Sequence, residues 1–291
     1  MTMRLSQEAV NEVAANGKLV LLQKSCSVWK LFPGAHGVNE AAMNGHLGIL
    51  KWMATLAQKV DINQYTANSA ASGGRLEVLE WMVTLEQAAY PDHDGADWTA
   101  FWGHIEVLKW MAELKPAVYP SQRGAGFAAL SGHLEVLKWI AERCSVYPGQ
   151  DGANVAAQSG QLEVLKWVVA NEQVCPDLKS INCAASKGHL DVLKWIAVEQ
   201  EVFPSQSGAN MAAHGGHLEV LKWMAERRVY PGQHGANLAA QGGHLEILKW
   251  MAALSPECLR VYPDQEGTEE AVLNKQTKVL EWLKERELIA S

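Results

Sequence analysis

The stretch Gly132-His133-Leu134-Glu135-Val136-Leu137-Lys138-Trp139 recurs, with small changes, along nearly the whole chain of 291 residues. Nine tryptophans close it at intervals of 27 to 32 residues: Trp52, Trp81, Trp110, Trp139, Trp167, Trp195, Trp223, Trp250 and Trp282. A fixed period of this size is typical of one small supersecondary unit that is stacked many times. It favours a binding scaffold over an enzyme with one buried active site.

A proline marks the start of the rigid part of each repeat. In eight repeats it precedes the tryptophan by 19 residues, as Pro231 precedes Trp250, and Ile62 holds the same place before Trp81. All variation in length therefore falls between a tryptophan and the next proline. The segment that returns to the next repeat is the part that tolerates insertion.

Two helices are predicted within this rigid part. In Gly235-Ala236-Asn237-Leu238-Ala239-Ala240 the alanines recur at helical spacing, which indicates a first helix with a small-residue face, and Gly243 is expected to end it. In Leu245–Ala252 the apolar positions fall on one face, with Glu246 and Lys249 on the other. The sequence therefore predicts an all-α solenoid of about ten helix-turn-helix repeats.

Because each repeat of a solenoid contacts only its neighbours, we expect one continuous domain over residues 1–291. Residues 1–32 would form an amino-terminal capping repeat and residues 33–254 the regular repeats. Residues 255–291 would hold a return loop and a carboxy-terminal capping repeat, since the polar ends of a stack face water.

The repeated pattern A-A-x-x-G-H-L-E-V-L-K resembles the centre of the ankyrin repeat. Two features depart from that family: Gly-Ala-Asn, as at Gly152-Ala153-Asn154, replaces its T-P-L-H opening, and the period is about five residues below its usual length. The short form is similar to the divergent ankyrin repeats of protists, oomycetes and large DNA viruses. The resemblance implies shortened hairpin loops and a protein–protein interaction scaffold that binds through the exposed face of its first helices.

Composition bears on the partner and the compartment. With 25 Lys and Arg against 32 Asp and Glu, the net charge of −7 has the wrong sign for holding phosphates, so we expect no nucleic-acid partner. The five cysteines (Cys26, Cys144, Cys175, Cys183 and Cys258) include no C-x-x-C pair and suggest neither a disulfide framework nor a zinc site. Residues 1–8 contain no apolar core of signal-peptide length. We expect a monomeric, cytoplasmic protein, in a host cell if it is viral, with no cofactor, metal or membrane partner.

Two recurrent polar residues have both a functional and a structural interpretation. The histidines after the helix-ending glycine suggest metal binding, but stacked repeats lie about 10 Å apart, and Arg75 and Gln161 occupy the same position. The asparagines before the alanine pair suggest a base-reading code, yet an asparagine near a helix start more often bonds to the backbone. We favour a bracing role for both. The repeated tryptophans are expected to stack into a continuous buried core between repeats.

Departures from the repeat locate the candidate site. Exposed positions that are small or polar in most repeats hold Trp98, Phe101 and Trp102 in the fourth repeat, and Phe127 and Leu130 in the fifth. Tryptophan-rich patches near the centre of a surface are typical of binding hot spots, and Asp94 and Arg123 would orient the partner. Alternatively, these aromatic residues cover a local irregularity or pack against residues 85–90.

We therefore predict a protein partner that binds at these residues. The alternative is a structural or adaptor module without a single hot spot. An enzyme or a helical-repeat RNA binder is least favoured, because no Ser/His/Asp set, paired carboxylate or phosphate-binding loop stands outside the repeat.

Overall fold

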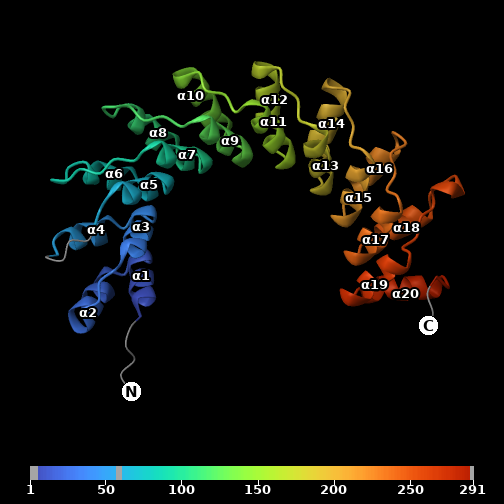
Figure 1. Ribbon diagram of the computed structural model, residues 1–291, viewed down its shortest axis with the longest axis horizontal. Coiled ribbons are helices and arrows are strands. Elements are labelled where there is room, and N and C mark those ends of the chain that lie inside the picture. The colour runs from blue at the N-terminus through green and yellow to red at the C-terminus, as the bar shows by residue number, and fades with distance from the viewer. Residues whose placement is uncertain (1–5, 57–60, 289–291) are drawn as a thin grey trace. The chain divides into compact units, whose positions relative to one another are not determined.

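The computed structural model describes residues 6–56 and 61–288, apart from the side chain of Cys258. Residues 1–5, part of the amino-terminal stretch considered above, lie outside the described residues. Within the described ranges the chain forms twenty α-helices, one 3-10 helix and no strand, and the α-helices follow one another as ten pairs (Figure 1). The prediction of an all-α helical repeat solenoid is confirmed.

The chain divides into two compact units, residues 1–152 and 153–291, and each is described by itself. In unit 1 the pairs are α1 (Gln7–Ala15) with α2 (Leu19–Trp29), α3 (Ala35–Met43) with α4 (Leu47–Ala54), α5 (Gln64–Ser72) with α6 (Leu76–Met82), α7 (His93–Phe101) with α8 (Ile105–Ala112), and α9 (Gln122–Ser131) with α10 (Leu134–Cys144). The boundary between the units falls inside α11 (Gly149–Gln158). The expectation of one continuous domain stays a prediction.

Unit 2 continues the same alternation of first and second helices. After α11 it contains α12 (Leu162–Glu172), α13 (Leu178–Ser186), α14 (Leu190–Glu199), α15 (Gln206–His214), α16 (Leu218–Ala225), α17 (Gln233–Gln241), α18 (Leu245–Ala252), α19 (Gln265–Leu273) and α20 (Thr277–Glu285). The longest return segment, after α18, contains the 3-10 helix η1 (Glu257–Leu259). The variation in length thus falls where the proline spacing predicts it.

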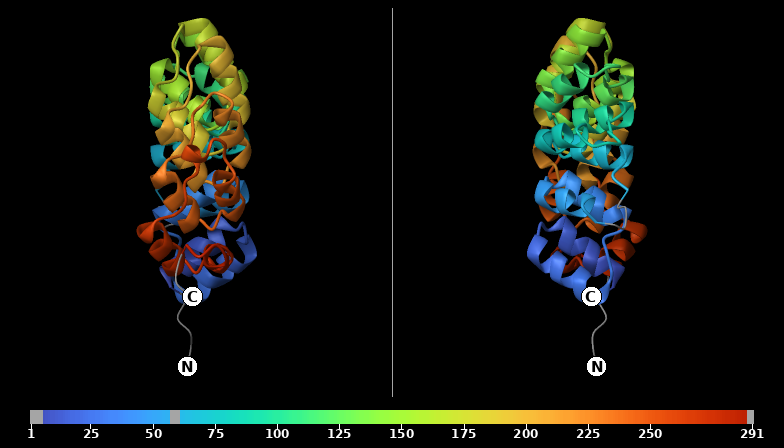
Figure 2. Two further views of the ribbon diagram at one scale, coloured as in Figure 1. Left: turned by 90° about the vertical axis from the view of Figure 1, so that its right-hand side faces the viewer. Right: turned by 90° about the vertical axis from the view of Figure 1, so that its left-hand side faces the viewer.

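The first helices pack directly on one another. In unit 1 α1 contacts α3, and the row continues through α5 and α7 to α9, as the ribbon views show (Figures 1 and 2). The alanines make this close approach possible: Ala70 and Ala71 of α5 are fully buried. At Gly73 a side chain would collide with the carbonyl group of Met43, so the backbones of neighbouring repeats approach closely there.

A residue in the left-handed backbone conformation follows each first helix and starts the turn to the second helix. Gly103, after α7, has φ +76°, and Gly243, after α17, has φ +75°, as predicted from its position. Glycine adopts this conformation without steric cost. In the second helix that follows, Glu246 and Lys249 form the expected i, i+3 ion pair at 2.9 Å. The turn and the polar face of the repeat were therefore both predictable.

The repeated tryptophans do not form the continuous buried core that the sequence suggests. The buried face of a second helix is built by positions such as Ile247, Leu248 and Met251, each at most 2% exposed. Seven of the nine repeated tryptophans are half-buried, and only Trp223 and Trp282 are buried. At least two of them contact an aromatic ring of the segment that leads into their own repeat: the rings of Tyr119 and Trp139 are 6.4 Å apart, and those of Tyr262 and Trp282 are 6.3 Å apart. In these two repeats the tryptophan packs that segment against the second helix.

Candidate functional site

An asparagine on most of the first helices joins its helix to the start of the next first helix. The Oδ1 atom of Asn68 accepts a hydrogen bond from the backbone N–H of Asp92 at 2.9 Å, and its Nδ2 donates to the Asp92 carboxylate at 2.9 Å. Equivalent bonds to a backbone N–H are made by Asn11, Asn154, Asn182, Asn210 and Asn237. The predicted bonding to backbone is confirmed, and it connects repeats.

This bond explains the Gly-Ala-Asn pattern that departs from the ankyrin opening. At Gly235 a Cβ would lie 2.6 Å from the Oδ1 atom of Asn210 in the preceding repeat, too close for any side chain. The third repeat solves the same problem differently, because Thr66 stands at the glycine position and its hydroxyl donates to Asn39 Oδ1 at 2.9 Å. The asparagine and the glycine are therefore two halves of one contact between repeats.

The histidine position forms a second connection between repeats. The Nε2 atoms of His46 and His244 lie 2.8 Å from the carbonyl oxygens of Ala15 and His214, at the ends of the preceding first helices. Arg75 and Gln276 occupy the same position and donate to the equivalent carbonyl groups. What this position requires is an N–H donor. Within the described residues no group of three or more His, Cys, Asp and Glu side chains is placed to hold a metal ion.

Four aromatic side chains of α7 and α9, Trp98, Phe101, Trp102 and Phe127, form what we call the aromatic cluster. The rings of Trp98 and Phe127 are 5.1 Å apart, and Phe101 meets Trp98 edge-on at 5.5 Å. Phe101 also meets Trp102 edge-on at 5.0 Å. Edge-to-face pairs of this kind contribute about 0.5–1.5 kcal/mol each. The partly buried phenylalanines thus hold two tryptophans that remain 45% and 50% exposed.

A charged network holds the polar edge of the cluster. Asp97 stands at the asparagine position and is buried, and its carboxylate accepts hydrogen bonds from Ser121 N at 2.7 Å and Arg123 Nε at 3.0 Å. Arg123 also pairs with Asp94 and lies over the Phe127 ring at 5.6 Å. The hydrogen bonds from Arg123 to Asp97 and then Asp94 raise the pKa of its guanidinium group. Asp94 and Arg123 therefore bind each other, with Arg123 held by two carboxylates.

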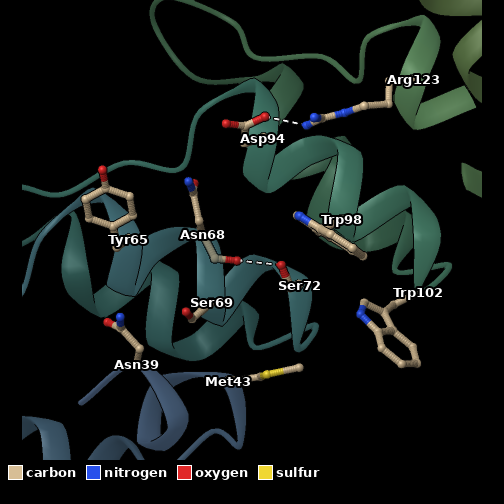
Figure 3. Close-up of a pocket in the computed structure, with 10 residues that line it drawn as sticks. All are labelled: Asn39, Met43, Tyr65, Asn68, Ser69, Ser72, Asp94, Trp98, Trp102 and Arg123. Atoms are coloured by element: carbon tan, nitrogen blue, oxygen red, sulfur yellow. Dashed lines mark hydrogen bonds and ion pairs between the residues drawn. The ribbon is translucent and has the colours of Figure 1, made fainter. Parts of the chain in front are cut away.

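A groove of about 580 Å³ lies beside the aromatic cluster, entirely within unit 1 (Figure 3). Trp98 and Trp102 form one wall, and Tyr65 and Met43 lie across from them. The groove exists because the third repeat has small side chains, among them Ser69 and Ser72, beside the bulky fourth repeat. The complete lining is Asn39, Met43, Tyr65, Asn68, Ser69, Ser72, Asp94, Trp98, Trp102 and Arg123.

The structure places six of the seven predicted site residues on α7 and α9, and the seventh, Trp102, directly after α7. It brings six of them into one network, while Leu130 is exposed on α9 at the helix position that Phe101 occupies on α7. Sequence reasoning missed Tyr65, which is 73% exposed on α5. Aligned repeats give the signal, because this helix position is otherwise polar: His36, Asp94, Arg123, Asp151, Lys179, Ser207, His234 and Glu266. The groove thus extends to the second and third repeats.

Comparison with known proteins finds likeness at the level of structure. No protein-family model matches the chain, and none of the curated proteins does. The pentatricopeptide repeat protein PPR10 from maize matches 97% of this chain and 53% of its own, at 13% identity and a TM-score of 0.32. The same protein in complex with an 18-nt psaJ RNA element matches 98% of this chain and 54% of its own, at 10% identity and a TM-score of 0.37. This chain spans about half the length of the chains it matches.

The expectation that nucleic acid is not a partner does not follow from the composition and is corrected here. That expectation rested on the net charge of −7, which averages over the whole surface, whereas a nucleic acid meets one face only. Nucleic acid therefore belongs among the partners to be tested. Among the described residues, no helix has the length and apolar character needed to cross a membrane.

Proposed function

We propose that the chain is a non-enzymatic scaffold of divergent, short-period ankyrin type that binds a protein partner on the exposed face of the first helices of unit 1. The observation that carries the proposal is the pair Trp98 and Trp102, about half exposed beside a groove. Large aromatic side chains at a concave surface are the residues that most often dominate binding energy. Their apolar area stays in contact with water until a partner covers it.

The rigidity of the site supports this function. Phe101 and Phe127 fix the Trp98 ring from two directions, and Arg123 is held over Phe127 by Asp94 and Asp97. A surface that is ordered before binding loses less conformational entropy when the partner arrives. The aromatic cluster is thus suited to act as a preformed anchor.

The test is affinity capture from a cell lysate with the tagged wild-type chain and with a Trp98→Ala, Trp102→Ala double variant. We expect the double variant to lose the captured protein, with a loss in affinity of about 30-fold or more for two hot-spot residues. Met211→Ala, at the position on α15 that matches Trp98, is the control and should retain it.

Each capture is repeated after ribonuclease treatment. A partner that survives ribonuclease and depends on both tryptophans supports the proposal. Partners captured equally by wild type and double variant contradict it, as does a ligand that ribonuclease removes.

A further inference from the structure

One helix position changes its character along the row of first helices in unit 1. This is the position directly after the asparagine that joins neighbouring repeats. It holds Glu12 on α1, Glu40 on α3, Ser69 on α5, Trp98 on α7 and Phe127 on α9. Equal positions of stacked helices form a row on the surface, as the 5.1 Å contact between the Trp98 and Phe127 rings shows. The row therefore runs from two carboxylates, through a small polar residue, to two aromatic rings.

The acidic end of this row is uncompensated. Glu12 is exposed and Glu40 is partly exposed, and neither forms an ion pair with any other described residue. At the aromatic end, by contrast, the charge of Arg123 is shared between Asp94 and Asp97. A ligand that covers the whole row meets negative potential at one end and apolar surface at the other.

An extended ligand suits the length of the row and the polar lining of the groove. From Glu40 to Trp98 the row crosses two helix spacings, about 16–20 Å, which an extended chain covers in about five or six residues. Two hydroxyl groups along the groove are suited to bond to the backbone of an extended segment: that of Ser69, and that of Ser72, which donates to the Asn68 carbonyl group at 2.8 Å and can still accept.

We propose that the groove binds an extended peptide segment of a protein partner, with a bulky apolar side chain at Trp98 and Trp102 and a lysine or arginine about five or six residues away, beside Glu40 and Glu12. The inference rests on the proposed function. It adds the chemical character of the bound segment and states which end of the row its apolar and basic side chains occupy. The carboxylates favour a basic peptide, whereas a nucleic acid would bring its phosphates against them.

The test begins with a displayed library of random dodecapeptides selected on the full chain. The best sequence is made as a fluorescent peptide, and its affinity is measured by anisotropy. We expect enriched peptides to pair a basic residue with a bulky apolar one at the stated spacing. A Glu12→Lys, Glu40→Lys double variant should weaken binding about tenfold, and added salt should weaken binding to the wild type. Glu77→Lys with Glu80→Lys on α6 changes the net charge equally, away from the row, and should leave the affinity unchanged.

Two failures are distinguishable. If the peptides depend on Trp98 and Trp102 but not on Glu12 and Glu40, the basic partner is wrong and the binding site stands. If no enriched peptide depends on the two tryptophans, the proposed function fails as well. A fluorescent single-stranded RNA that binds through the tryptophans, and more tightly after Glu12→Lys and Glu40→Lys, overturns the proposal in favour of nucleic acid.

Discussion

The buried carboxylate of Asp97 accepts a hydrogen bond from Arg123 Nε across 26 residues of sequence, at 3.0 Å. Asp97 also joins the fourth repeat to the fifth as asparagine joins other repeats, because its carboxylate accepts a hydrogen bond from the backbone N–H of Ser121 at 2.7 Å. Its side chain is 3% exposed, whereas that of Arg123 is 54% exposed. The exchange of asparagine for aspartate thus adds a charge, and that charge brings Arg123 to the edge of the aromatic cluster.

Asp97→Asn is therefore expected to destabilise unit 1 by about 1–3 kcal/mol, since the amide retains an acceptor for Ser121 N but leaves the buried site without its charge-assisted bonds. Unfolding in urea, followed by circular dichroism, measures the change. Arg123→Gln is the matched comparison and should cost less than Asp97→Asn, because the Asp97 carboxylate keeps its charge-assisted bonds from Ser121 N and Oγ. Equal stability of Asp97→Asn and wild type would contradict this role for the carboxylate.

Lys275 provides a test of the turn between helices. It stands where the other repeats have the helix-ending glycine, and it adopts φ +57° between α19 and α20. A left-handed non-glycine residue costs about 1 kcal/mol, so Lys275→Gly should raise the free energy of unfolding by up to that amount. Gly243→Ala should lower it, because Gly243 has φ +75° and packs against Gln276. The midpoints of urea denaturation of the two variants should therefore shift in opposite directions. A destabilised Lys275→Gly would show that the left-handed conformation at this position is not strained.

The histidine connections predict a loss of stability in mild acid. Burial, more than any other cause, lowers the pKa of His104, His189 and His217. The unfolded chain then binds protons at a higher pH than the folded chain. The neutral histidines therefore make their full contribution to the free energy of unfolding above the pKa of histidine in the unfolded chain, about 6.5. That contribution is lost as the pH falls through the lower pKa values of the folded chain.

His217→Gln tests this directly, because glutamine occupies the equivalent position at Gln276 and still donates to a carbonyl group. We expect the variant to lose less stability than wild type between about pH 7.5 and pH 5.5, measured by urea denaturation at each pH. Asp177, whose pKa is lowered mainly by a hydrogen bond from the Ser180 backbone, changes the free energy of unfolding only below about pH 4, outside this range. An unchanged pH dependence in His217→Gln would contradict the assignment.

The frame of the repeat was predictable because it follows from local rules. Helical spacing of Ala239 and Ala240, the glycine at position 243 and the i, i+3 pair of Glu246 and Lys249 each depend on residues within one repeat. The contacts between repeats were not fully predictable, because they depend on how far one helix is offset from the next. The bond of Asp97 to Arg123 and the position of Tyr65 across from Trp98 are set by that offset.

The same limit explains the tryptophans. Periodicity identifies the inward face of a second helix, but it does not separate the centre of that face from its edge. Leu248 and Trp250 both point inward by pattern, yet Leu248 is fully buried and Trp250 is half-buried. Trp102 was visible because its position is small or polar in the other repeats, and Trp98 because Phe127 alone matches it as an aromatic residue at that position.

The difference between the centre and the edge of this face can be measured in α18. Leu248→Ala should cost about 2–5 kcal/mol, since it removes a fully buried side chain and leaves a cavity that the helix pair cannot close. Trp250→Ala removes more atoms, but they are partly hydrated in the folded chain, so its cost should fall below the 3–5 kcal/mol typical of a buried tryptophan. Trp282→Ala is the matched buried case, with Tyr262 stacked at 6.3 Å and Arg286 over its ring at 5.0 Å, and should reach that range. Urea denaturation of the three variants should rank Trp250→Ala as the mildest, and a larger loss there than in Leu248→Ala would restore the tryptophan row as the core between repeats.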